Sequence, residues 1–224
     1  MKKILVLLYL NMFCIVPIMA FYVDSINYAI TSETTVEVTS PQDFVPSNLF
    51  IPEQITYEGK VYNVTSIGDS AFMWCYELTS ITIPNGVTTI RDAAFSYCNA
   101  LRTIEIPNSV ISIGKRAFEN SYLISIELPN SVISIGDSAF MWCPLTFIEI
   151  PNSVTTIGKC AFSHCNAFSI SVDGGNNIYD SRDNCNAIIE TATNALIVGT
   201  HNTVVPSSVT GIGDYAFCGC DSLQ

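Results

Sequence analysis

Cysteine and histidine are the side chains here that most often bind metals or act as nucleophiles, and the chain has nine cysteines and two histidines. The pairs Cys160-x4-Cys165 and Cys218-x-Cys220 lack the paired ligand spacing of a structural zinc site. His164 stands directly before Cys165, but adjacent helical residues point about 100° apart, so a nucleophile and base pair is not expected. The sequence also lacks a phosphate-binding loop and a Gly-x-Ser-x-Gly motif. We therefore expect no catalytic residue, no metal site, no cofactor and no enzymatic activity.

Carboxylates provide the other candidate chemistry. The three aspartates at 173, 180 and 183 could ligate calcium, but their spacing does not match a calcium-binding loop. Glu105, Glu127 and Glu149 follow one another at equal intervals. We expect them to form an open row, which does not place an acid and a base on opposite sides of a cleft.

These equal intervals reflect an internal repeat of about 23 residues, a period typical of solenoids in which stacked copies bury a shared core. One copy reads Ile81-Thr82-Ile83-Pro84, then Val87, Ile90, Ala94-Phe95 and Cys98, and Leu101 begins the next. Ala-Phe pairs stand in phase at 71–72, 94–95, 117–118, 139–140, 161–162 and 216–217, each preceded four residues earlier by isoleucine.

Each copy predicts one short strand and one short helix. In residues 101–106 the apolar Ile104 and Ile106 alternate with polar residues, as in a half-buried strand, and Pro107 ends it. The apolar residues at 67, 71, 72, 75 and 78 would gather on one face of a short helix. Stacking would pair the strands in a parallel sheet at a spacing of about 4.8 Å.

The pattern Leu-x-x-Ile-x-Ile-Pro-x-x-Val-x-x-Ile-Gly-x-x-Ala-Phe-x-x-Cys, nearly intact from Leu101 to Cys143, resembles the BspA-like leucine-rich repeats of bacterial and protozoan surface proteins. The resemblance covers residues 62–224, and residues 24–61 resemble the strand-rich cap of bacterial members. It implies an α/β leucine-rich-repeat solenoid with a parallel β-sheet face, short helices on the opposite side and a strand-rich N-terminal cap.

We divide the chain on this basis. Residues 1–20, with Lys2-Lys3 and an apolar run before Ala20, predict a signal peptide, although an uncleaved anchor is the alternative. A β cap would then occupy 21–61, leucine-rich repeats 62–168, an irregular unit containing a hairpin 169–205 and a final incomplete repeat 206–224. Because the chain stops where another strand is due, we expect a truncated product or a partner at that end.

Removing Lys2 and Lys3 leaves seven basic and 20 acidic residues, a net charge near −13. This sign disfavours nucleic acid and anionic membranes as partners.

The cysteines are expected to be largely structural. Five of them occupy one repeat position, which predicts an inward column of buried thiols, with Ser121 in the third copy. The column is Cys75, Cys98, Cys143, Cys165 and Cys220. Disulfides remain the alternative in an exported chain, and Cys160, Cys185 and Cys218 are the better candidates for them.

The outward positions of the predicted strands form the candidate ligand-binding surface. Its residues are Thr82, Thr103, Glu105, Glu127, Phe147 and Glu149. The carboxylates would contact a basic or hydroxyl-rich partner and Phe147 would anchor it; the alternative is a solvated face that keeps the sheet soluble. Trp74 and Trp142 are expected to pack across neighbouring copies.

We therefore predict a secreted or cell-surface protein-binding solenoid, with no membrane span in the mature chain. The family resemblance implies an adhesin-like role in attachment to host or matrix proteins. One alternative is a structural surface protein that assembles with its own kind. A second is a carbohydrate-associated accessory module.

Overall fold

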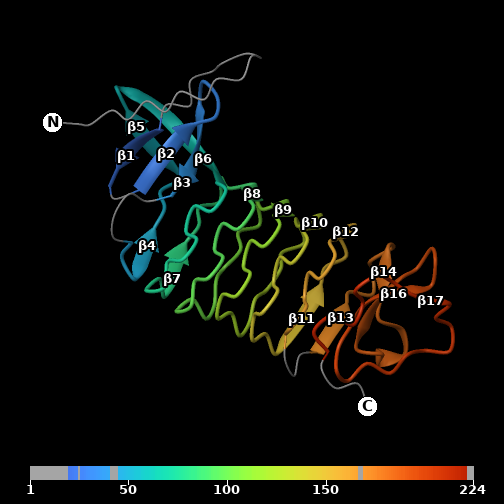
Figure 1. Ribbon diagram of the computed structural model, residues 1–224. Helices are drawn as coiled ribbons and strands as arrows, with labels where there is room; N and C mark the ends of the chain where they lie inside the picture. The colour runs from blue at the N-terminus through green and yellow to red at the C-terminus, as the bar shows by residue number, and fades with distance from the viewer. Residues whose placement is uncertain (1–19, 25, 41–44, 166–168, 221–224) are drawn as a thin grey trace, which may run out of the picture.

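The computed structural model describes residues 20–24, 26–40, 45–165 and 169–220; the expected signal peptide lies almost entirely outside this range. Successive copies of the repeat lie side by side in sequence order, so that the molecule extends along one axis (Figure 1). Leu, Ile and Val side chains of the copies point into a shared interior that continues from Phe21 to Ile188. The predicted solenoid with a parallel strand-rich face is confirmed.

The first strand ladder is formed by the Ile-x-Ile segments of the repeat, which end at a proline. β4 (Asn48–Phe50) pairs in parallel with β7 (Ser80–Thr82), and β11 (Phe147–Ile150) with β13 (Ser169–Val172). Between these pairs, the copies are joined by parallel bridges from Glu105 to Glu127 and from Ser125 to Phe147.

A second parallel ladder follows the proline turn. It runs through the C-terminal end of β6 (Lys60–Ile67), then β8 (Thr89–Ile90), β9 (Ser112–Ile113), β10 (Ser134–Ile135) and β12 (Thr156–Ile157). In β8, β9 and β10 the isoleucine that ends the strand is buried and its polar neighbour is half-buried.

The short helices expected opposite the strands are not present, and this prediction was wrong. In the described residues the one helical element is a single-turn 3-10 helix, η1 (Arg182–Asn184). The Ala-Phe segments are consecutive turns instead, with left-handed backbone at two positions per copy, for example Ser70 (φ 54°) and Trp74 (φ 64°). Because the handedness of the backbone alternates along these turns, their peptide groups point along the solenoid axis. Phe72 N therefore donates a hydrogen bond to Ala94 O of the next copy at 2.8 Å. Hydrogen bonds between copies thus replace those within a helix.

The phenylalanines of these turns form a continuous stack in the core. The rings of Phe72, Phe95, Phe118, Phe140 and Phe162 lie parallel, with centroids 5.3 to 5.5 Å apart. The rings of Phe95, Phe118 and Phe140 therefore each pack against both neighbouring copies, and a single copy could not bury its own phenylalanine.

The N-terminal strands extend the second ladder. β1 (Ala20–Val23), β2 (Ile26–Ile30) and β3 (Thr35–Thr39) pair antiparallel in sequence, and β3 then pairs in parallel with β6. β5 (Gln54–Tyr57) forms an antiparallel hairpin with the start of β6.

A four-stranded sheet follows β13. β14 (Tyr179–Asp180), β15 (Ala187–Glu190) and β16 (Ala195–Gly199) are antiparallel neighbours, and β17 (Gly211–Ile212) pairs in parallel with β16. The β15 to β16 connection is the turn at 191–194. Across the described ranges, the fold contains no helix with the length and apolar character needed to cross a bilayer.

Candidate interaction surface

The six predicted ligand-binding residues all lie on the outer side of the first strand ladder, and all are exposed. We call these residues, Thr82, Thr103, Glu105, Glu127, Phe147 and Glu149, the strand face. The isoleucines that alternate with them, such as Ile104 and Ile148, are buried. The period of two therefore separates a core side from a free side in every copy.

The strand register brings part of this set together. Glu105 pairs directly with Glu127, and Phe147 lies between Ser125 and Ser169 on the neighbouring copies. The same register places Glu149 beside Ser171, so the carboxylate row ends there. Thr82 and Thr103 lie on copies nearer the N-terminus, separated from Phe147 by intervening strands.

Sequence reasoning missed Phe50, whose side chain is 67% exposed beside Thr82. The signal was present, because Leu49-Phe50-Ile51-Pro52 has the same form as Ile81-Thr82-Ile83-Pro84. Phe50 thus provides an exposed aromatic side chain beyond Thr82 at one end of the acidic row, and Phe147 provides another beside Glu149 at the other end.

The acidic row costs the fold little. Carboxylates on strands about 4.8 Å apart repel by somewhat under 1 kcal/mol in a water-like dielectric, and salt screens them further. Basic side chains do not interleave with Glu105, Glu127 and Glu149 at this repeat position. A row of like charges without intervening cations is electrostatically suited to a basic partner.

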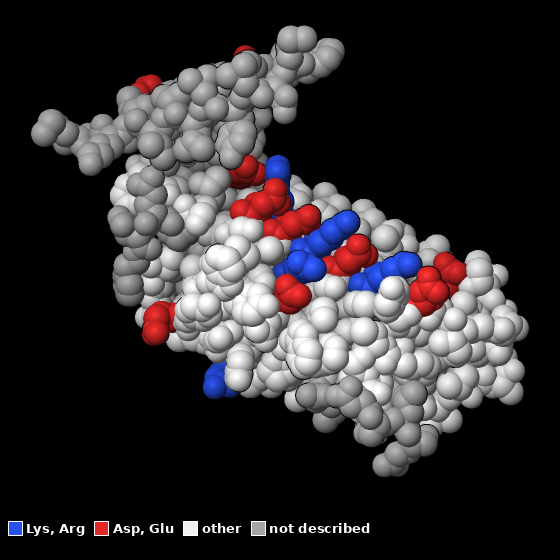
Figure 2. Space-filling model, viewed as in Figure 1, with Lys and Arg blue, Asp and Glu red and all other residues white. Residues whose placement is uncertain are grey.

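Charges near the turns are arranged differently. There acidic and basic side chains alternate in a band over the repeats (Figure 2). Lys115 Nζ lies 3.5 Å from Asp137, and Arg91 Nε lies 3.2 Å from Glu37. These groups satisfy one another, so this band is less suited than the strand face to recruiting a charged partner.

The expected packing of tryptophan across copies holds for Trp142, whose ring stacks on that of His164 with centroids 3.8 Å apart. Both Trp74 and Trp142 nevertheless remain about half exposed. Because Trp142 and His164 lie face to face, their shared faces are closed to a ligand.

The predicted inward column of buried thiols is confirmed for three of its five cysteines, whereas Cys75 and Cys220 are only partly buried. Cys98, Cys143 and Cys165 are buried, and each donates its thiol to the backbone oxygen of a phenylalanine, at 3.0 to 3.2 Å. Ser121 at this position in the third copy differs, because its hydroxyl donates to Phe118 O of its own copy at 2.8 Å, whereas the thiols donate to the preceding copy. Burial raises the pKa of the Cys143 thiol to about 12, which makes it a poor nucleophile.

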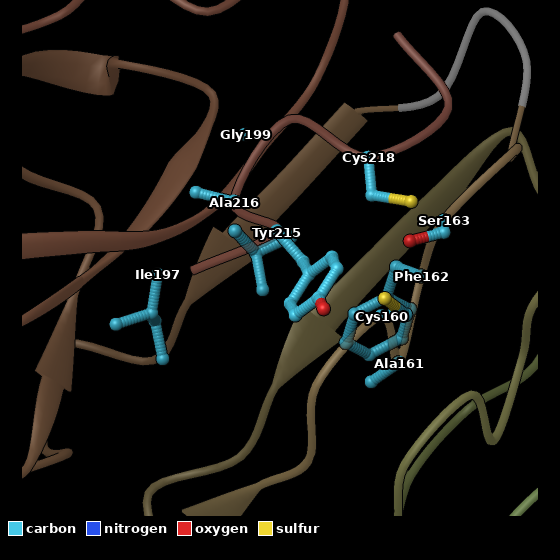
Figure 3. A pocket seen from close by; sticks show the side chains of 10 residues that line it. Cys160, Ala161, Phe162, Ser163, Ile197, Gly199, Tyr215, Ala216 and Cys218 are labelled. Carbon is cyan, nitrogen blue, oxygen red and sulfur yellow. The ribbon is translucent and has the colours of Figure 1, made fainter. Parts of the chain in front are cut away.

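Residues suited to metal or acid chemistry do not converge. The described ranges contain no group of three or more His, Cys, Asp or Glu side chains that could hold a metal ion. Asp180 instead accepts a hydrogen bond from Arg182 Nε at 2.8 Å, which is the main cause of its lowered pKa. A pocket at the C-terminal end of the repeats is lined by residues 160–163, by residues 197–199 of β16 and by Tyr215, Ala216 and Cys218 (Figure 3).

Comparison with known proteins defines the class. The model of the BspA type leucine rich repeat region matches in six copies over residues 46–169 and 196–224. This chain therefore belongs to the BspA-type leucine-rich repeat family. Members of such families are generally protein-binding and non-enzymatic. No match is found among curated proteins.

Solved bacterial structures share the fold. A leucine-rich repeat protein from Bacteroides ovatus is 42% identical, with a TM-score of 0.64, over 68% of this chain and 40% of that protein. A leucine rich cell surface protein from Faecalibacterium prausnitzii is 26% identical, with a TM-score of 0.62, over 92% of this chain and 69% of that one. The pneumococcal vaccine antigen PcpA, at 23% identity and a TM-score of 0.69 over 89% of this chain and 62% of that one, shares the fold alone. This chain thus spans less than half of the Bacteroides ovatus relative.

Proposed function

We propose that this chain is an exported, adhesin-like protein that attaches to a host or matrix protein through the strand face. The observation that carries the proposal is the complete exposure pattern of that surface. All six of its residues are exposed although the alternating residues of the same strands are buried. Selection for folding alone requires only the buried set.

The chemistry of the strand face indicates the kind of partner. Glu105, Glu127 and Glu149 form a carboxylate row, and Phe50 and Phe147 supply exposed aromatic area near its two ends. Aromatic side chains are favoured as anchors of protein interfaces, and charge complementarity increases the association rate. A protein surface with a basic patch fits both features.

Export and surface display are parts of the same proposal. The Lys2-Lys3 and apolar pattern of residues 1–20 supports a signal peptide. The Faecalibacterium prausnitzii relative is described as a cell surface protein, which supports a similar location here. We also infer that the strands within 21–61 cap the first repeats, since β3 continues the ladder through β6.

The strand face can be tested with a triple Glu→Gln variant at 105, 127 and 149. We expect binding to immobilised host matrix proteins to weaken by about tenfold or more, because close interfacial charges contribute over 1 kcal/mol each when paired. A matched control carries Glu→Gln at 33, 53 and 58, which are exposed in the connections between the N-terminal strands. Both variants have the same net charge.

Three results would separate the alternatives. Equal binding of the two triple variants would remove the strand face from the proposal. Self-association of the wild-type chain in light scattering, lost in the strand-face variant, would favour the self-assembling surface protein. Binding to polysaccharide in place of protein would favour the carbohydrate-associated module.

A further inference from the structure

Two thiols outside the buried column meet at the C-terminal end of the repeats. Cys160 precedes the fifth Ala-Phe pair and Cys218 follows the sixth, so 57 residues lie between them in the sequence. Both side chains line the same pocket, together with Ser163 and Tyr215 (Figure 3). Neither is fully buried, in contrast to Cys98.

Several contacts hold the two segments against each other. Lys159 Nζ lies 3.3 Å from Asp214 and 5.6 Å from the centre of the Tyr215 ring. A Cβ atom added to Gly219 would lie 2.4 Å from the backbone nitrogen of His164, so the two backbones approach closely. Burial raises the pKa of the Cys160 thiol, the neighbouring Ser163 hydroxyl lowers it and the neighbouring Cys218 thiol raises it, in keeping with the shared pocket of these three residues.

We propose that Cys160 and Cys218 form a disulfide bond. This bond fastens the segment after the irregular unit to the hydrogen-bonded Ala-Phe turns of the preceding copies. The oxidant is a small-molecule or protein disulfide. One cysteine thiolate attacks the donor disulfide, forming a mixed disulfide and releasing one donor thiolate. The other cysteine thiolate attacks the mixed disulfide, which forms the Cys160–Cys218 bond and releases the second donor thiolate. Two electrons pass to the donor, and the two cysteine protons are taken up by solvent or the released thiolates.

Four of the other cysteines in the described ranges are buried away from this pocket. Cys98, Cys143 and Cys165 are buried between copies as donors to backbone oxygens. Cys185 is buried in a separate small cluster with Leu196 and Ala216. An exported chain would meet the oxidising conditions in which disulfides persist, so the pair fits the proposed location, although the chemistry can be tested without it.

The test uses the full purified chain, first reduced and then incubated with oxidised glutathione. Remaining thiols are alkylated in denaturant, and the digest is mapped by mass spectrometry without reduction. We expect one linked peptide pair containing Cys160 and Cys218, at more than about tenfold excess over any other pairing, because these two partly exposed thiols line one pocket. Alkylation of both residues after oxidation would overturn the proposal, as would a bond from either to Cys185 or Cys220, or bonds only between chains.

A second measurement uses the double variant C160S/C218S. Serine already occupies the equivalent positions as Ser138 and Ser163, so the substitutions suit the local backbone. We expect the oxidised wild-type chain to lose several degrees of thermal midpoint on addition of reductant, and the variant to show no such change. Equal sensitivity of both chains to reductant would contradict the proposal.

Discussion

Substitution of Phe118 by alanine should show how strongly each copy depends on its neighbours. The side chain is fully buried, and its ring stacks on Phe95 at 5.4 Å and on Phe140 at 5.3 Å. Phe→Ala changes in cores cost about 3–5 kcal/mol, and each aromatic pair contributes about 0.5–1.5 kcal/mol beyond buried area. With two stacking partners lost, we expect the free energy of unfolding to fall by about 4–5 kcal/mol.

The assay is urea denaturation followed by far-ultraviolet circular dichroism, with the slope compared between variants because repeat proteins can unfold in segments. F147A provides the control, since that phenylalanine lies on the exposed strand face and its loss should change stability by about 0.5 kcal/mol or less. F72A is intermediate, because Phe72 stacks on Phe95 at the start of the column. A cost for F118A no greater than that for F147A would refute a core shared between copies.

Three further predictions concern charges and thiols. E127Q removes repulsion from two neighbouring carboxylates, so it should stabilise the fold by up to about 1 kcal/mol at low ionic strength and by less in high salt, measured as a midpoint shift; a gain independent of salt would contradict this. Cys143 should resist alkylation in the native chain at pH 8 and react on unfolding, since burial raises its pKa to about 12. Burial raises the pKa of Glu37 in the folded state, although the nearby Arg91 lowers it in part. Because the folded state then binds a proton more tightly than the unfolded state, protonated Glu37 contributes to the free energy of unfolding at low pH. This stabilisation is lost as the pH rises through the folded-state pKa. R91A should raise the Glu37 midpoint further in an NMR titration; a lower midpoint would contradict the ion pair.

The positions of the repeats, the buried isoleucines and the inward cysteines could be predicted from the sequence, because similar apolar residues recur at the same position of each copy. The turn segments could not. The spacing of Ile67, Ala71, Phe72 and Cys75 fits one face of a helix, and it equally fits consecutive turns that point the same residues inward. Glycine is the residue most often found where the backbone is left-handed, but Ser70 and its equivalents in the other copies are not glycines. The residue types at these positions therefore did not indicate the turns.

Phe50 was missed for a different reason. Its strand has the repeat pattern, but the hairpin of β5 and β6 lies between Pro52 and Val64, where other copies have a short turn. The backbone still closes as in the other copies, since Val64 N donates to Glu53 O at 2.9 Å much as Val87 N donates to Pro84 O at 3.1 Å. The inserted hairpin thus changes the spacing of the repeat in the sequence, but the strands on either side of it keep the arrangement of the other copies. This is consistent with a family match that begins at residue 46.

The same construction makes binding separable from folding. Neighbouring copies are joined by backbone hydrogen bonds along the two strand ladders and between the Ala-Phe turns, and by side chains that point inward. Outward side chains of the strand face take no part in those bonds, so changing Glu105, Glu127 and Glu149 should leave the stack intact. A loss of attachment by that variant with an unfolding midpoint that is unchanged or raised would therefore report on recognition, whereas a lowered midpoint would mean that the strand face also supports the fold.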